Sequence, residues 1–173
     1  MRVFLTSSPA GNYFTSDGKR VACKLDESNN FVDELKKCWK DNAKCLMISA
    51  APNEYEMNDS MRDIFLQTFP MSGLSVSEMM VWDHRNTEQA EDFLAQFDML
   101  LLSGGHVPTQ NAFFKEIELG DKICEYNGIV IGISAGTMNC ADLVYAMPEL
   151  EGEALDKTYR RFVLGLGLTD IMV

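Results

Sequence analysis

The chain has 173 residues, a length typical of one globular domain that can bury a core without a metal or disulfide. It carries 26 acidic and 15 basic residues, which gives a formal net charge of −11 at pH 7. This excess of negative charge repels phosphate backbones and anionic lipids, so we expect no binding to nucleic acid or to a membrane surface. No apolar run approaches the ~18 residues that a membrane-spanning helix needs.

Three further features of the sequence limit the class of protein: the N-terminus, the cysteines and the histidines. Residues 1–11 contain too short an apolar stretch for a secretory signal, and the five cysteines form no C-x-x-C pair. We therefore expect reduced thiols and a cytoplasmic protein. The two histidines, His84 and His106, do not have the spacing of metal ligands, so we predict no metal site and no cofactor.

Strand patterns and helix patterns alternate along the chain. In the first half we predict a strand at 2–6, a long Ser-, Gly-, Asn- and Asp-rich loop at 8–30, a helix at 31–42, a strand at 45–50, a helix at 56–70 and a strand at 78–83. Next come a helix capped by Thr87, whose core face is Ala90, Phe93, Leu94 and Phe97, then a strand at 98–103 and a helix at 109–127. The last predicted elements are a strand at 129–133, a helix from Ser134 to about Tyr145, a loop around Pro148 and residues 149–153, and a strand at 161–168.

Several of these strands are continuous apolar runs, which are typical of a parallel sheet covered on both faces. Their alternation with helices predicts one α/β domain over residues 1–173, a doubly wound and mostly parallel sheet with helices on both faces. In such a sheet, ligands bind beyond the carboxyl ends of the strands.

The sequence Gly132-Ile133-Ser134-Ala135-Gly136 joins the most apolar strand to the helix that follows it. A G-x-S-x-G pattern in this position is typical of a nucleophile elbow. The sharp turn lifts the serine oxygen out of the sheet, and the glycines remove side chains that would clash there. The amide of Ala135 would then help to stabilise an oxyanion. The other interpretation is a tight turn with a capping serine.

A second turn, Ser103-Gly104-Gly105-His106, follows the preceding apolar strand. Paired glycines allow the backbone to approach a ligand closely. Because the ends of adjacent strands meet at one edge of the sheet, Gly105 is a candidate for the second oxyanion amide. The other interpretation is an ordinary strand-to-helix turn.

The stretch DMLLLSGG, followed by a helix and then IVIGISAGTM, resembles the peptidase E and cyanophycinase family of serine peptidases. The resemblance covers most of the chain and is strongest at residues 98–140. It implies a class I glutamine amidotransferase-like, flavodoxin-like fold with serine in place of the cysteine nucleophile. By this resemblance Ser134 is the nucleophile, Gly105 and Ala135 supply the oxyanion amides, and Gln110 contacts the substrate.

The sequence departs from that family at the base and at the acid. The family carries a histidine after the serine, in a Pro-His pair behind a late strand, whereas no histidine follows Ser134 here. The family's acid would fall at Ala146, so the nearby Glu149 and Glu151 are substitutes chosen by their proximity, and Glu149 is the candidate we carry forward. His106 is a candidate base because it follows Gly105 at the adjacent strand end.

Three interpretations of the missing base remain open. In the first, the chain is part of a longer peptidase whose base lies beyond Val173, so the domain is incomplete at its C-terminus. In the second, His106 is the base. In the third, the site binds a ligand without turnover, because a serine with no positioned base is a poor nucleophile. A sheet cut after a late strand would leave apolar faces uncovered, so we also expect lower stability than in a longer version, or pairing as a homodimer.

The leading hypothesis is therefore a serine hydrolase that cleaves small peptides through an acyl-enzyme, with aspartyl peptides implied by the resemblance. An α/β-hydrolase-type esterase is a second hypothesis, because it shares the G-x-S-x-G pattern. A catalytically degenerate, amidotransferase-like ligand-binding module is the third. A glutamine amidotransferase is disfavoured, because position 134 is serine and Cys140 lies in the following helix. The expected partner is a small peptide substrate.

Overall fold

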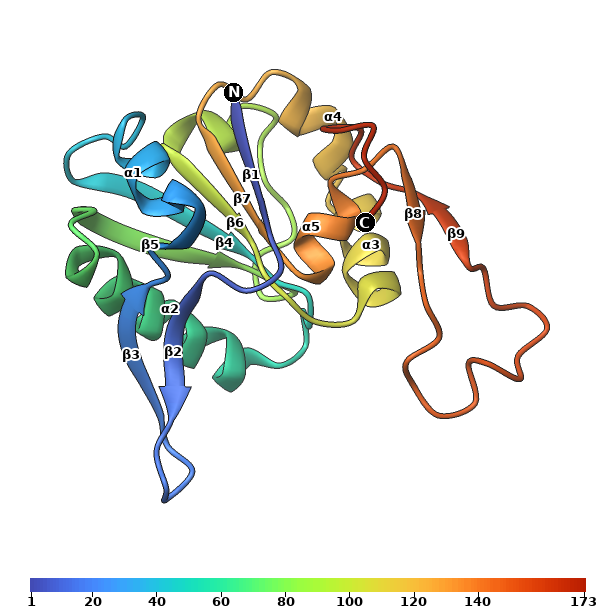
Figure 1. The fold of residues 1–173 in the computed structure, drawn as a ribbon. Coiled ribbons are helices and arrows are strands. Elements are labelled where there is room, and N and C mark those ends of the chain that lie inside the picture. The colour runs from blue at the N-terminus through green and yellow to red at the C-terminus, as the bar shows by residue number, and fades with distance from the viewer.

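A parallel sheet of five strands forms the centre of the molecule (Figure 1). The computed structural model describes residues 1–173. The strands are β1 (Arg2–Thr6), β4 (Ala43–Ile48), β5 (Val76–Trp82), β6 (Met99–Leu102) and β7 (Ile129–Ile133). Their order is β1-β7-β6-β4-β5, with every pair parallel. The last four strands keep the flavodoxin-like arrangement, and β1 is added beside β7.

The two faces of the sheet bury separate clusters of apolar side chains. Because side chains alternate along a strand, Leu46 and Ile48 of β4 face one cluster, while Cys45 and Met47 face the other. The first cluster is covered by α3 (Val107–Glu116) and α4 (Leu119–Cys124), and the second by α1 (Phe31–Lys36) and α2 (Tyr55–Met71). The predicted doubly wound α/β fold with helices on both faces is therefore confirmed.

The segment predicted as a loop at 8–30 instead contains a β-hairpin. Strands β2 (Ala10–Phe14) and β3 (Arg20–Leu25) pair antiparallel outside the central sheet. The hairpin is anchored to α2, where Thr68 Oγ1 donates to the carbonyl of Gly11 at 2.5 Å and Ser72 Oγ accepts from the amide of Leu25 at 2.9 Å. The loop prediction was wrong because the segment is rich in polar residues typical of loops, although two short strands form within it.

The helix predicted to run from Ser134 to about Tyr145 is much shorter. It forms α5 (Ala135–Asn139), and β8 (Leu143–Tyr145) then pairs antiparallel with β9 (Phe162–Leu164). The helix ends early because the amide of Leu166 donates to the carbonyl of Asn139 at 2.9 Å and the amide of Leu168 to that of Cys140 at 2.8 Å. The last predicted strand, at 161–168, therefore shrinks to β9 and lies outside the central sheet.

Three other helix predictions were also too long. The helix predicted at 31–42 ends at Lys36, where α1 ends. The segment from Thr87 forms only a 3₁₀ turn, η2 (Phe93–Gln96). Phe93, Leu94 and Phe97 are buried as predicted, whereas Ala90 is exposed. The predicted helix at 109–127 is divided into α3 and α4, because Glu118 takes a left-handed conformation with φ of 55°. A second 3₁₀ turn, η1 (Ser28–Asn30), precedes α1.

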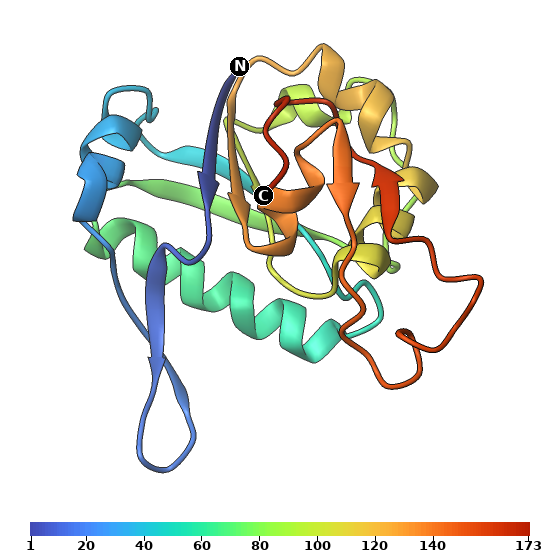
Figure 2. The ribbon, with the colours of Figure 1, turned by 45° about the vertical axis from the view of Figure 1, so that its right-hand side comes forward.

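Two excursions of the chain flank the carboxyl edge of the sheet. The β2–β3 hairpin projects on one side, and the connection between β8 and β9 projects on the other, in both views (Figures 1 and 2). The edge between them carries the turns that follow β1, β4, β6 and β7. None of the helices combines the length and the apolarity that crossing a membrane would require.

Candidate functional site

Ser134 occupies a strained turn between β7 and α5. Its φ is 49° and its ψ is −109°, a combination that residues with a side chain rarely adopt. The residue is exposed, although the residues that follow it in α5 are mostly buried. An exposed hydroxyl on an outlying backbone conformation is a reason to look for function at this turn.

Both glycines around Ser134 are required by close packing. A Cβ on Gly132 would lie 2.8 Å from the backbone of Thr137, and a Cβ on Gly136 would lie 2.2 Å from the carbonyl oxygen of Leu102 in β6. Both distances are far inside van der Waals contact, so a side chain at either position would push α5 away from the sheet. The spacing of the two glycines therefore follows from the geometry of this strand-to-helix turn.

The turn is also held by the end of β1. The carbonyl of Thr6 accepts from the amide of Ser134 at 2.9 Å and from Thr137 Oγ1 at 2.7 Å. In return, Thr6 Oγ1 donates to the carbonyl of Gly132 at 2.7 Å. These bonds join residues about 130 positions apart in the chain, and they keep the strained serine in place.

The double glycine predicted as the second oxyanion element lies against the serine. A Cβ on Gly104 would lie 3.4 Å from the Cβ of Ser134, and a Cβ on Gly105 would lie 2.8 Å from that of Ala50. Gly104 and Gly105 are exposed, whereas Ala135 is buried at the first position of α5. The amide of a first helical residue has no partner inside its own helix. The structure thus brings Ser134, Ala135 and the Gly104-Gly105 turn together.

No acid or base contacts the hydroxyl of Ser134. The Nδ1 of His106 lies 2.7 Å from Thr109 Oγ1, and its Nε2 lies 3.0 Å from the Glu153 carboxylate.

The second histidine, His84, is also held by neighbouring side chains. Its Nδ1 lies 2.7 Å from Asn53 Oδ1, and its Nε2 lies 3.1 Å from Glu116 Oε2. Both imidazoles are therefore engaged by other groups in this arrangement.

The acid that contacts His106 is Glu153, whereas Glu149, predicted as a substitute for the family's acid, forms no ion pair with either histidine. Glu153 Oε2 accepts from the amides of Leu150 and Glu149, at 3.0 and 2.9 Å. These amides, together with the imidazole of His106, lower the pKa of the Glu153 carboxyl. The side chain of Glu149 is exposed. Sequence proximity could not separate the two glutamates, because the pairing depends on how the β8–β9 connection folds back.

Gln110 does not have the position expected of a substrate contact. It is fully buried, and its Nε2 donates to the carbonyl of Ser103 at 2.7 Å. Its Oε1 accepts from Asn139 Nδ2 at 3.0 Å. Both ends of the amide are thus used to join the double-glycine turn to the end of α5, which is a supporting role.

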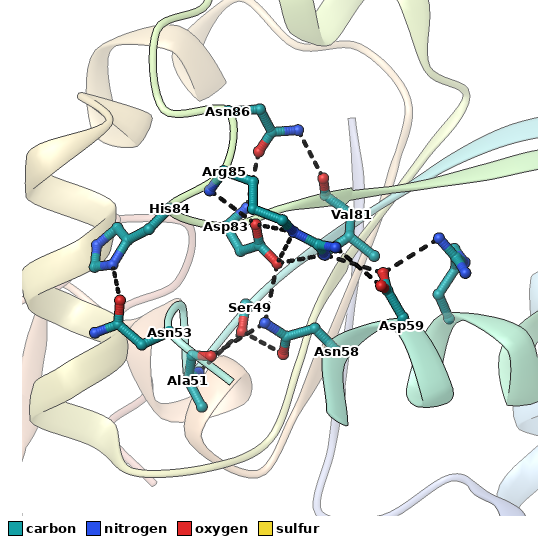
Figure 3. Close-up of polar contacts among 11 residues, drawn as sticks. Ser49, Ala51, Asn53, Asn58, Asp59, Val81, Asp83, His84, Arg85 and Asn86 are labelled. Carbon is teal, nitrogen blue, oxygen red and sulfur yellow. Dashed lines mark hydrogen bonds and ion pairs between the residues drawn. The ribbon is translucent and has the colours of Figure 1, made fainter. Parts of the chain in front are cut away.

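A buried polar network that was not predicted from the sequence lies at the same edge of the sheet (Figure 3). The Asp83 carboxylate, completely buried after β5, accepts from Arg85 Nη2 at 2.7 Å and from Asn58 Nδ2 at 3.1 Å. Asn58 Oδ1 accepts from Ser49 Oγ at 2.8 Å, and Arg85 also pairs with Asp59 through two bonds of 2.9 Å. The network ties the ends of β4 and β5 to the start of α2.

The network also sets the ionisation of its carboxylates. Burial alone would raise the pKa of Asp83, but hydrogen bonds from Arg85 and Asn58 outweigh it and hold the pKa below its ordinary value. The pKa of Asp59 is lowered mainly by its hydrogen bonds from Arg85. One feature of the sequence could have predicted this network: a run of polar residues, Asp83 to Asn86, directly follows an apolar strand.

The cysteine nearest to Ser134 in the sequence is not placed for chemistry. Cys140 is completely buried, and burial raises the pKa of its thiol to about 12. A thiol in this environment stays protonated and inert. This agrees with the prediction that Cys140 is not an amidotransferase nucleophile.

Comparison with known proteins supports the fold. No protein-family profile and no curated protein sequence match the chain. A candidate peptidase E protein from Listeria monocytogenes EGD-e superposes with a TM-score of 0.52 at 13% identity, over 80% of this chain and 70% of that one. A peptidase from an acI-B1 Actinobacterium has a TM-score of 0.46 at 18% identity, and the match covers 72% of this chain and 51% of that one. At 13% identity the first comparison is evidence of fold alone, and the chain has a peptidase E-like α/β fold.

Proposed function

We propose that the protein is a serine-type hydrolase that acts on small peptides, with Ser134 as the nucleophile. The observation that carries the proposal is the exposed, strained Ser134 beside the Gly104-Gly105 turn. Nucleophile elbows have this strand–serine–helix geometry. The likeness of the fold to a candidate peptidase E protein is in keeping with the same reaction class.

In the proposed mechanism, Ser134 Oγ attacks the carbonyl carbon of the scissile amide. The tetrahedral intermediate places its negative oxygen against the amides of Gly105 and Ala135, which act as an oxyanion hole. Collapse of the intermediate breaks the C–N bond, the protonated amine leaves, and an ester on Ser134 remains. Water then hydrolyses this acyl-enzyme and restores the serine.

The mechanism requires a base that takes the serine proton and returns it to the leaving amine. Two sources are compatible with the arrangement: His106 released from Glu153, and a histidine after residue 173, as the family resemblance implies. The variant His106→Ala separates them in a protein of full natural length. Loss of reaction at Ser134 assigns the role to His106, and retained reaction assigns it to the other source.

The first test is labelling with a fluorophosphonate, followed by intact mass. We expect one adduct on the native protein, none on Ser134→Ala and one on Ser60→Ala, whose serine is exposed on α2 away from the turn. The Ser134→Ala variant should no longer cleave an aspartyl dipeptide. The free energy of unfolding of this variant should stay within about 0.5 kcal/mol of that of the native protein. An adduct that persists in Ser134→Ala would remove Ser134 from the mechanism.

A ligand-binding module without chemistry is the second candidate, because no acid or base touches Ser134 and both histidines are engaged elsewhere. Its signature would be a dipeptide that raises the melting temperature without being cleaved and without any fluorophosphonate adduct. An esterase of the α/β-hydrolase type would instead hydrolyse aryl esters in preference to dipeptides.

A further inference from the structure

A pocket of about 260 Å³ opens next to the Ser134 turn. One wall consists of Ser103, Gly104 and Ile133, at the ends of β6 and β7, and the opposite wall is formed by the β2–β3 hairpin and α2. Ile133 directly precedes Ser134, so the pocket adjoins the proposed nucleophile. The volume lies below the ~300–1,000 Å³ of sites for drug-sized ligands, and it suits a group no larger than an amino-acid side chain or a peptide terminus.

Arg20, on β3 of the hairpin, is the only charged residue that lines this pocket, and no acidic residue lines it. The absence of carboxylates is notable in a chain with a net charge of −11. A single cation in the lining of a pocket without carboxylates favours an anionic ligand group over a cationic one there.

The guanidinium of Arg20 has no carboxylate partner within the protein. It lies over the ring of Phe14, 4.8 Å from the ring centroid, and its Nη1 contacts the sulfur of Met61. Its Nε is closed off from solvent and has no hydrogen-bond partner. Two nearby arginines differ from Arg20, because Arg62 and Arg85 both form ion pairs with the Asp59 carboxylate.

A buried donor without a partner is rare in folded proteins, because it loses its hydration and gains nothing in return. The Nε–Nη2 edge of an arginine matches the two oxygens of a carboxylate. Arg20 lines the pocket, so a carboxylate bound there could accept from this edge. The ring and Met61 limit the side chain to few positions, which lowers the entropy lost on binding.

We propose that Arg20 is a specificity residue, which holds a carboxylate of the ligand in the pocket beside Ser134. The inference rests on the proposed function for the identity of the ligand as a peptide. Two parts of a peptide could supply the carboxylate, an acidic side chain or the C-terminus. The chemistry at Arg20 is the same for both, and the experiment distinguishes them.

The test measures binding in the Ser134→Ala background, so that no peptide is consumed. Isothermal titration would compare Asp-Leu, Asn-Leu and the C-terminal amides of both. Arg20→Gln should weaken binding of the preferred acidic peptide about tenfold to a hundredfold, and added salt should weaken binding more in the protein that keeps Arg20 than in the variant. Lys24→Gln is the matched control, since it removes one positive charge from β3 at an exposed position that does not line the pocket.

The peptide series identifies the source of the carboxylate. Loss of affinity from Asp-Leu to Asn-Leu assigns it to the side chain, and loss from the acid to the C-terminal amide assigns it to the terminus. Equal affinity of all four peptides, or equal effects of Arg20→Gln and Lys24→Gln, would overturn the proposal.

Separate controls distinguish a failure to fold from a failure of the proposed hydrolase function. If Arg20→Gln loses its circular dichroism signal, Arg20→Lys serves instead, because it keeps the charge but not the planar fork, and a severalfold loss of affinity is expected. Binding that depends on Arg20 in a protein that gives no fluorophosphonate adduct would support the pocket and reject the hydrolase. An adduct on Ser134, together with binding that is unchanged by Arg20→Gln, would support the hydrolase and reject the role of Arg20 in the pocket.

Discussion

At the scale of single residues, Ser134 is a strained residue held in place by its neighbours. Conformations of this kind cost about 1–3 kcal/mol for a residue with a Cβ. We predict that Ser134→Gly raises the free energy of unfolding by about 1 kcal/mol, because glycine tolerates a φ of 49°. Ser134→Ala keeps the Cβ and should leave stability unchanged. Urea unfolding at pH 7 compares the two, and a glycine variant no more stable than the alanine variant would argue against the strain.

Gly136 and Gly120 are two helical glycines in different surroundings. An added methyl on Gly136 would meet the Leu102 carbonyl at 2.2 Å, so Gly136→Ala should destabilise the protein by about 2–3 kcal/mol. Gly120 lies in α4 with nothing within 4 Å of its missing Cβ. Gly120→Ala should therefore stabilise by about 0.5–1 kcal/mol through helix propensity. Denaturant midpoints give both values, and equal effects would contradict the packing argument.

At the scale of elements, the network around Asp83 is the joint between β4, β5 and α2. Asp83→Asn removes the buried carboxylate to which Arg85 and Asn58 donate, and because Arg85 is itself exposed and keeps its bonds to Asp59, we expect a cost of about 1.5–3 kcal/mol. Asp63→Asn is the control, because Asp63 makes an exposed pair with Arg62 and exposed pairs contribute less than about 1 kcal/mol. Thermal unfolding compares the two variants. A cost for Asp83→Asn no larger than for Asp63→Asn would show that the joint does not stabilise the fold.

At the scale of the whole molecule, several carboxylates link stability to pH. The pKa values of Asp59, Asp83 and Asp98 are lowered in the folded protein. Groups of this kind stabilise the fold above their unfolded pKa of about 4 and lose that contribution as the pH falls through the lower, folded pKa. We predict a free energy of unfolding that is nearly flat from pH 7 to 5 and falls toward pH 3. Urea titrations at these pH values test this, and the fall should be smaller in Asp83→Asn.

The β8–β9 sheet leaves apolar surface exposed on the outside of the molecule. Leu143 pairs with Leu164 across the strands, and Leu164 and Phe162 are 71% and 55% exposed. Patches of this kind favour association. We predict that the 173-residue chain self-associates in sedimentation velocity and that Leu164→Lys reduces this. Leu155→Lys, at an exposed site in the β8–β9 connection, should not. A native chain that remains monomeric at high concentration would contradict the homodimer expectation.

The parts of this protein that the sequence determined by itself are those encoded by consecutive residues. The strand at 129–133, the turn at Ser134 and the double glycine after β6 could be predicted because apolar runs form buried parallel strands and glycines mark sharp turns. The edge of the sheet that carries them also followed, since the carboxyl ends of parallel strands face the same way. The helix–strand alternation was therefore enough for the fold class.

Tertiary structure decided everything that depends on residues far apart in the chain. The segment 140–145 has a helical pattern, but bonds from residues 166–168 end α5 and allow β8 to form. Glu153 rather than Glu149 meets His106, and Arg20 reaches the pocket beside Ser134, only because the β8–β9 connection and the β2–β3 hairpin fold over the same edge. No local pattern encodes such contacts, because their free energy comes from packing between distant segments, which overrides the weak preferences of short ones.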